Sequence, residues 1–209
     1  MSDRNLPWSQ LYQARREVQK KYKKIWKVPI SKRYSTVLFD QGRDGMSVLE
    51  IGAGTRGLQK KVTKHWSNVS YKSMDIDDTN GHDFNSLEEI AGEYDMICMF
   101  EVIEHVRPEH AYEILSRCKE ILKPGGLLLV STPNIYHPPT FLRDATHITP
   151  WCYDELGAIA MISGFKIKEI YRLYHDSLVG RLLHRVLLYP LHKAMSLDFS
   201  KQVILVAEV

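Results

Sequence analysis

The sequence predicts an α/β protein with a mostly parallel sheet, and three observations support this prediction. Apolar runs of strand length alternate along the chain with segments of helical periodicity, as a doubly wound sheet requires. The apolar run at residues 48–51 leads into a glycine-rich loop at residues 52–57, where a backbone can turn sharply and approach a ligand. The 209 residues, 44% of them hydrophobic, can bury a sizeable core, and their number favours one domain over two.

The period of the apolar residues assigns the elements in order along the chain. Strands are expected at 46–52, 69–76, 94–101, 126–132, 165–174 and 202–209, with a very short strand near Asp83. Helices are expected at 8–27, 55–66, 86–92, 109–122, 150–162 and 178–189. Charged residues alternate with Ile167 and Ile170 in the fifth of these strands, which is the period-two pattern of a sheet edge.

The glycine loop and its neighbours predict a nucleotide-binding crevice. Amides at the start of the following helix can hold an anionic group, and Asp75, at the end of the next apolar run, can accept hydrogen bonds from a ribose diol. The G-x-G-x-x-G spacing alone does not exclude a nicotinamide enzyme. Glu50, however, places a carboxylate two residues before the first glycine, which is unfavourable beside a pyrophosphate and favourable beside a sulfonium.

Several motifs follow one another in the chain. They are VLEIGAG at 48–54, MDI at 74–76, HDF at 82–84, YDMICMFEVIEH at 94–105, LKPGG at 122–126, LLLVSTPN at 127–134 and SGF at 163–165. Together they resemble the class I S-adenosylmethionine-dependent methyltransferases over roughly residues 46–165. The EVIEH and STPN segments are most similar to the ubiquinone-biosynthesis type O-methyltransferases and their uncharacterised relatives.

The resemblance implies a Rossmann-like fold with a seven-stranded, mostly parallel sheet and a closing antiparallel hairpin. It also implies a methyltransferase domain at 37–209, an N-terminal basic helical lid at 1–36 and a helical insertion at about 176–196. The donor is S-adenosylmethionine, with Asp75 on the ribose, Ile76 beside the adenine and the amides near Gly54 at the methionine end. The residues expected to bind the donor are Glu50, Gly52, Ala53, Gly54, Asp75, Ile76, Asp83, Phe84 and Phe100.

The catalytic residues are expected after the third strand, at Glu101, Glu104 and His105. Their i, i+3, i+4 spacing places them on one face if a helical turn begins there. His105 is then the candidate general base that removes the proton of an acceptor hydroxyl, and Phe100 and Glu101 line the methyl channel. The expected acceptor is a hydroxyl oxygen of a small or glycan-like molecule.

The same cluster is also a candidate metal site. Glu101, Glu104, His105 and the later His147 are similar to the cation ligands of the small-RNA 3′-terminal 2′-O-methyltransferases, which makes a metal-dependent RNA ribose methyltransferase the alternative function. Asp144 is not adjacent to His147, and 209 residues leave no room for the accessory RNA-binding domains of that family. The favoured interpretation is therefore a site without metal. A non-catalytic partner protein that keeps the fold is a further alternative.

Basic residues are concentrated near the N-terminus. Residues 15–33 contain nine Lys and Arg against one acidic residue, Glu17. The preferred interpretation is a solvated helix that packs over the core, and the alternative is a nucleic-acid-binding face. The helical pattern at 178–189 segregates apolar from basic residues, so peripheral membrane contact is a second alternative to an insertion that covers the acceptor. No apolar run is long enough to span a bilayer and no signal peptide is evident, which predicts a cytoplasmic protein.

Overall fold

The computed structural model describes residues 6–31, 33–174 and 178–209. The helices are α1 (Trp8–Tyr22), α2 (Tyr34–Gln41), α3 (Gly57–His65), α4 (Pro108–Glu120), α5 (Pro138–Leu142), α6 (Tyr153–Ile162), α7 (Leu178–Leu182) and α8 (Tyr189–Ala194), with a π-helical turn, Leu183–Leu187, between the last two. Short 3₁₀ turns are η1 (Ile25–Lys27), η2 (Asp78–Asn80) and η3 (Ile103–His105). The strands are β1 (Ile30–Ser31), β2 (Ser47–Ile51), β3 (Ser70–Met74), β4 (Tyr94–Phe100), β5 (Leu122–Pro133), β6 (Lys166–Leu173) and β7 (Gln202–Glu208).

The strands form one seven-stranded sheet in the order β1-β6-β7-β5-β4-β2-β3. All neighbouring pairs are parallel except β5/β7 and β6/β7, which are antiparallel. The predicted mostly parallel sheet with a closing antiparallel hairpin is therefore confirmed. The seventh strand is not the predicted one near Asp83, where a single bridge joins Met74 to Phe84, but β1 at the opposite edge.

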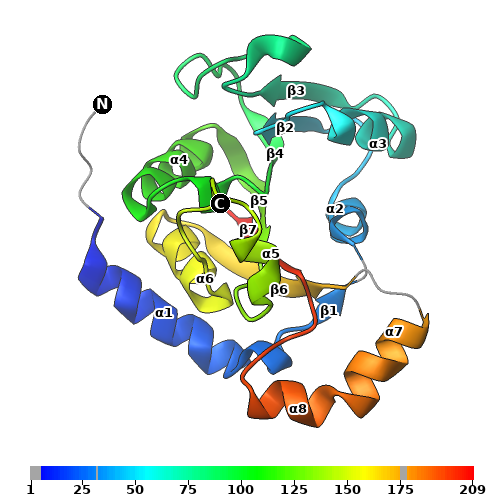
Figure 1. Cartoon of the computed structure of the whole chain (residues 1–209). Helices are drawn as coiled ribbons and strands as arrows, with labels where there is room; N and C mark the ends of the chain where they lie inside the picture. Colours follow the sequence, from blue (N-terminus) through cyan, green and yellow to red (C-terminus); the bar gives the residue numbers. More distant parts are fainter. Residues whose placement is uncertain (1–5, 32, 175–177) are drawn as a thin grey trace.

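Helices cover both faces of the sheet (Figure 1). On the face of α1, α4 and α6, buried residues such as Leu115 join Leu49 of β2 in one apolar core. On the face of α2 and α3, Val62 and its neighbours pack against Val48, the residue that precedes Leu49 in the strand. Successive strand residues point to opposite faces, so a continuous apolar run fills both layers. Among the described residues, no helix combines the length and apolarity needed to cross a membrane.

Two local predictions about helices were wrong. The first helix ends at Tyr22 rather than residue 27, because Lys23 adopts a left-handed conformation (φ 60°) and η1 then redirects the chain into β1. No helix forms at 86–92; Glu89 instead accepts a hydrogen bond from the Asn85 amide at 2.7 Å and closes a turn. The short elements β1, α2 and α5 were not predicted, because two to eight residues carry little periodicity.

The predicted lid corresponds to α1, which lies along α6. Arg15 donates hydrogen bonds to Asp154 at 2.8 Å and to Glu155 at 2.9 Å across this contact. The end of α1 borders a cavity that Tyr136 and Tyr153 also line, next to the chain that follows β5. A covering role for α1 over the donor stays a prediction, and residues 1–5 and 32 of the predicted lid segment lie outside the described residues, as do residues 176 and 177 of the predicted insertion.

Arg172 of β6 holds the N-terminal segment against the sheet. Its buried guanidinium donates to the Val28 carbonyl at 2.9 Å and to Asp198 at 2.8 Å. A third bond, of 3.3 Å, reaches the carbonyl of Trp26, whose own indole donates to the Leu197 carbonyl at 3.0 Å. Burial raises the pKa of Asp198, and the adjacent guanidinium counteracts this shift. One arginine thus ties the segment after α1 to the chain that enters β7.

Candidate active site

The predicted site residues meet at one edge of the sheet. The parallel strands β2, β3, β4 and β5 end there, and the chain moves outward in opposite directions after β2 and after β4. Such a reversal of strand order leaves a crevice beyond the carboxyl ends of the two central strands. Most of the expected donor residues follow β2 and β3, Glu50 and Phe100 lie near the ends of β2 and β4, and the expected catalytic residues follow β4 (Figure 1). The structure therefore brings both sets to this crevice.

The glycine loop is held close to β3. The amides of Gly52 and the buried Ala53 both donate to the Met74 carbonyl, at 2.9 and 3.2 Å. Gly52 has a φ of 72°, and a Cβ atom at this position would lie 2.3 Å from Cγ2 of Val102. Only glycine fits this conformation and this close approach without displacing the loop that carries the expected catalytic residues.

Asp75 reaches back to the glycine loop. Its Oδ2 accepts a 2.7 Å hydrogen bond from the Gly54 amide, and its Oδ1 accepts a 3.0 Å bond from the Asp77 amide. The next side chain, Ile76, is 87% exposed. An exposed aliphatic side chain next to a carboxylate suits adenosine. The flat face of the base can lie against the aliphatic group, and the ribose diol can bond to the carboxylate.

Asp83 and Phe84 pair with the end of β3. The carboxylate of Asp83 accepts bonds from Lys72 at 2.8 Å and from the Ser73 amide at 2.9 Å. Burial opposes ionisation of Asp83, but these hydrogen bonds outweigh it and lower its pKa. The Phe84 carbonyl accepts a bond from the Asp75 amide at 3.2 Å. The backbone at Phe84 thus holds Asp75 at the end of β3, and contact of Asp83 and Phe84 with the adenine stays a prediction.

Glu50 lies under the glycine loop and is almost fully buried, with 7% exposure. The Tyr71 hydroxyl donates a hydrogen bond to it. Burial raises the pKa of Glu50 to about 7, although this hydrogen bond and the positive charge of Lys61 oppose the shift. The nearby Asp75 carboxylate raises it further. A cation in the crevice would therefore stabilise the ionised form of Glu50.

The helical turn predicted across Glu101, Glu104 and His105 does not form. Glu101 adopts a left-handed conformation (φ 56°), which interrupts any helix between β4 and η3, and its carboxylate accepts a 2.8 Å bond from Ser131. Phe100 packs its ring 4.9 Å from that of Tyr34. A strained non-glycine residue at a crevice is a common feature of functional sites.

Glu104, His105 and His147 nevertheless converge. One ligand atom from each lies within 4.8 Å of the others. Nε2 of His147 is 3.9 Å from Oε1 of Glu104, and the two imidazole rings are 4.8 Å apart. The amides of Ile148 and Thr149 donate to the Glu104 carbonyl at 2.9 and 3.0 Å, so the backbone itself holds the loop at 133–149 against η3.

The side chain of Glu104 is completely buried. Burial raises its pKa to about 8, and the negative charge of Glu101 adds to the shift. The Thr132 hydroxyl lowers the pKa of Glu104, but it is not placed to form a hydrogen bond of normal geometry. Among the described residues, neither carboxylate oxygen of Glu104 has a hydrogen-bond partner. Buried carboxylates without a partner are costly, so this one points to a ligand or a proton.

Both histidines are oriented by the backbone. Nδ1 of His147 lies 2.8 Å from the Phe141 carbonyl, and Nδ1 of His105 lies 3.2 Å from the Thr146 carbonyl. A carbonyl can only accept, and the Thr146 hydroxyl, 2.9 Å from Nδ1 of His105, already donates to Asp144 at 2.7 Å. These contacts favour the tautomer with the proton on Nδ1, which leaves the lone pair on Nε2. Asp144 lies 3.8 Å from Nε2 of His147, and hydrogen bonds from Thr146 lower its pKa.

This donor set fits a divalent cation. A buried carboxylate and two imidazoles with anchored Nδ1 atoms match the mixed oxygen and nitrogen ligands of Mn²⁺ or Zn²⁺, and the anchoring carbonyls act as the outer ligand shell does in known metal sites. Glu101, the fourth residue of the candidate metal set, does not belong to the group. The sequence analysis missed the contributions of Asp144 and Thr146, which depend on how the loop folds back.

Comparison with known proteins decides the family. A family model described as a methyltransferase domain matches residues 14–175 of this chain. The chain belongs to this methyltransferase family. The predicted class I methyltransferase is thus confirmed, with S-adenosylmethionine as the methyl donor of the family.

Individual relatives of the methyltransferase agree with this assignment. The chain is 26% identical to a ubiquinone biosynthesis O-methyltransferase of Pseudomonas aeruginosa, over 66% of this chain and 72% of the relative. It is 36% identical to the protein of that name from Cereibacter sphaeroides, but over only 44% of this chain and 34% of the relative. A SAM-dependent methyltransferase from Archaeoglobus fulgidus shares the fold, with a TM-score of 0.67 at 18% identity over 93% of this chain and 94% of that one.

Proposed function

We propose that this methyltransferase transfers a methyl group from S-adenosylmethionine to a hydroxyl oxygen of a small-molecule or glycan-like acceptor. The observation that carries the proposal is the cluster of Glu104, His105 and His147 beside the donor crevice. Methyl transfer to a hydroxyl oxygen requires removal of the hydroxyl proton, whereas an acceptor that is already deprotonated needs no base. The relatives named as O-methyltransferases also support an oxygen acceptor.

In the proposed reaction the hydroxyl oxygen attacks the methyl carbon in line with the sulfonium sulfur. The carbon–sulfur bond breaks as the carbon–oxygen bond forms, and the sulfur leaves as a neutral thioether. The hydroxyl proton passes to Nε2 of His105, which the contact of Nδ1 with Thr146 leaves unprotonated. Asp75 and Ile76 hold the adenosine, the glycine loop before Gly54 faces the methionine end, and Phe100 and Glu101 border the path of the methyl group.

The unpartnered carboxylate of Glu104 favours a second version of this mechanism. A divalent cation held by Glu104, His105 and His147 would lower the pKa of a bound hydroxyl. His105 would then act as a ligand and not as the free base. An RNA ribose hydroxyl is the alternative acceptor for this version, because such a hydroxyl is a weak acid.

A transfer assay with labelled donor tests the proposed function. Phenols, catechols, sugars and RNA with a free 3′ end would be compared as acceptors, with S-adenosylhomocysteine release as the readout. We expect turnover with at least one hydroxyl acceptor and loss of turnover in a His105→Gln, His147→Gln double variant that still binds S-adenosylhomocysteine. Donor binding without turnover on any acceptor would instead support a non-catalytic partner protein.

A further inference from the structure

The segment between β6 and β7 exposes an unusual number of aliphatic side chains. They recur at every third or fourth position along α7, the π-turn and α8, as residues on one side of a helix do. These residues, which we call the apolar stripe, are Val179, Leu182, Leu183, Val186, Leu187, Leu191 and Met195, with exposures of 41–78%. A stripe of this length on the outside of a protein marks an interaction surface.

The inner side of the same segment is polar. The rings of His184 and His192 stack at 5.6 Å from each other, and each lies 6.3 Å from the buried ring of Phe199. A surface helix of a soluble protein normally turns its aliphatic residues inward and its polar residues outward. This segment does the reverse, so its aliphatic side is not needed for the core of the described chain.

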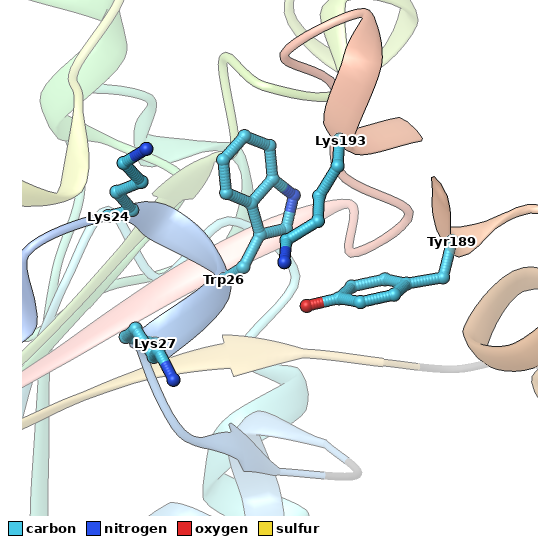
Figure 2. Close-up of a pocket in the computed structure, with 5 residues that line it drawn as sticks. All are labelled: Lys24, Trp26, Lys27, Tyr189 and Lys193. Atoms are coloured by element: carbon cyan, nitrogen blue, oxygen red, sulfur yellow. The ribbon is translucent and has the colours of Figure 1, made fainter. Parts of the chain in front are cut away.

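A basic pocket lies beside α8, the helix that carries Leu191 of the stripe. Figure 2 shows the side chains that line this pocket. The pocket, of about 260 Å³, is lined by Lys24, Trp26, Lys27, Tyr189 and Lys193. The Lys193 ammonium lies 5.0 Å from the centre of the Tyr189 ring. All three ammonium groups are exposed, and the lining includes no acidic side chain.

The two chain segments that line the pocket carry charge of one sign. Residues 18–33 and 178–197 contain no Asp or Glu, while each of the two stretches contains several Lys or Arg. Lys24 and Lys27 follow α1, whereas Lys193 belongs to α8, and the bond from Trp26 to the Leu197 carbonyl holds the two segments together. The pocket is therefore part of the fold and not of one loose segment.

We propose that the apolar stripe and the basic pocket together bind the surface of an anionic lipid bilayer. The aliphatic side chains enter the boundary between headgroups and acyl chains, and the lysines meet the lipid phosphates, with Trp26 and Tyr189 at the interface. Pairing of two copies through this face would bring the lysines of both copies together, which like-charge repulsion opposes. A soluble phosphate alone would leave the stripe unexplained. The proposal does not rest on the proposed methyl acceptor.

Co-sedimentation with vesicles tests the proposal. The full chain would be mixed with vesicles of phosphatidylcholine alone or of phosphatidylcholine with phosphatidylglycerol. We expect binding to be at least about tenfold stronger when the anionic lipid is present. A variant with Leu182→Ser, Val186→Ser and Leu187→Ser, and a second with Lys24→Glu and Lys27→Glu, should each lose most of this binding.

The control variant carries Lys60→Glu and Lys64→Glu on α3. These exposed lysines lie on another helix and give the same change in net charge, so the control should bind like the unmodified chain. Circular dichroism and thermal unfolding confirm that each variant is folded. Sedimentation of the stripe variant equal to that of the unmodified chain would overturn the proposal. So would dimers that only the stripe substitutions dissociate, or preferential binding of an RNA oligonucleotide that those substitutions leave intact.

Discussion

Nε2 of His147 lies 3.9 Å from a carboxylate oxygen of Glu104, in a place that solvent does not reach from the Glu104 side. One residue comes from the turn after β4 and the other from the loop after β5, so the pair depends on the meeting of two parallel strands at one sheet edge. Neither residue has a structural reason to face the other unless a proton or a cation lies between them. The first prediction follows from this pair.

We predict that Mn²⁺ binds to the full chain and that a Glu104→Gln variant binds it at least about tenfold more weakly, because the anionic ligand is lost. Calorimetry and the electron paramagnetic resonance of Mn²⁺ measure this without any acceptor. Glu88→Gln is the matched control, since Glu88 is exposed and lies outside the group of three converging residues. Activity that survives EDTA, together with absent Mn²⁺ binding, would support His105 as a free base.

Substitution of Asp75 by alanine should weaken S-adenosylhomocysteine binding by at least about tenfold. The change removes both acceptors for the ribose hydroxyls, and hydrogen bonds to a charged group contribute about 1.5–3 kcal/mol each. It also removes the acceptor of the Gly54 amide. Asp77→Ala, two residues along the chain, should bind the ligand normally. Calorimetry gives both affinities, and NAD should bind to neither protein; unchanged affinity in Asp75→Ala would contradict the ribose assignment.

Glu50 should make stability depend on pH. Its pKa in the folded protein, about 7, is above that of an unfolded glutamate, so the folded state binds the extra proton. The stability that this extra proton contributes is fully present below the pKa of the unfolded glutamate, and it is lost as the pH rises through 7. A Glu50→Gln variant keeps an acceptor for Tyr71 and has no charge to bury. It should nearly match the unmodified chain at pH 4 and exceed it by up to about 3 kcal/mol near pH 8.5.

Urea denaturation without ligand at several pH values measures this difference. A constant difference across the range would show that Glu50 does not titrate with a raised pKa. The same variant gives a separate readout with ligands. If Glu50 faces the sulfonium, Glu50→Gln should weaken binding of S-adenosylmethionine more than that of S-adenosylhomocysteine, whose sulfur is uncharged.

Arg172→Ala should destabilise the protein by about 3–5 kcal/mol, because it leaves the buried Asp198 without its cation. Lys20→Ala is the contrasting variant, since the pair of Lys20 with Glu17 is exposed and should contribute little. Urea denaturation compares the two. If Arg172→Ala were as mild as Lys20→Ala, Arg172 would not be holding the N-terminal segment.

The role of α1 as a lid can be tested by hydrogen exchange. We expect residues near the end of α1 to exchange more slowly when S-adenosylhomocysteine is bound, because this end borders the cavity beside Tyr136. Equal exchange with and without the ligand would leave α1 as a support for α6, joined to it through Arg15 and Asp154.

The sequence predicted the central strands and the donor loop because their signals are local. The run at 48–51, the glycines after it and Asp75 lie within one β-α-β unit, where spacing alone determines proximity. The same reasoning failed after β4. The left-handed conformation of Glu101 and the return of the loop that carries Asp144 and Thr146 depend on contacts between distant segments, and no short-range pattern records them.

Amphipathic patterns were similarly limited. The spacing of apolar residues in α1 showed that one side is buried, and Tyr22 is indeed buried, but it could not show that α6 receives that side. For α7 and α8 the pattern predicted two sides, and the structure shows the aliphatic one. It could not reveal that the aliphatic side faces outward, because that depends on His184 and His192 meeting Phe199.

Arg172 bonds Trp26, Val28 and Asp198 at once, and Trp26 bonds Leu197, so β6 is joined to both chain segments that line the basic pocket. Strand β6 runs parallel to β5 and ends at the same edge as the donor crevice. If the apolar stripe rests on a bilayer, the protein therefore has a fixed tilt there. The mouth of the crevice then keeps a constant height above the lipid, and an acceptor that partitions into the bilayer would have a short and defined route to the methyl group.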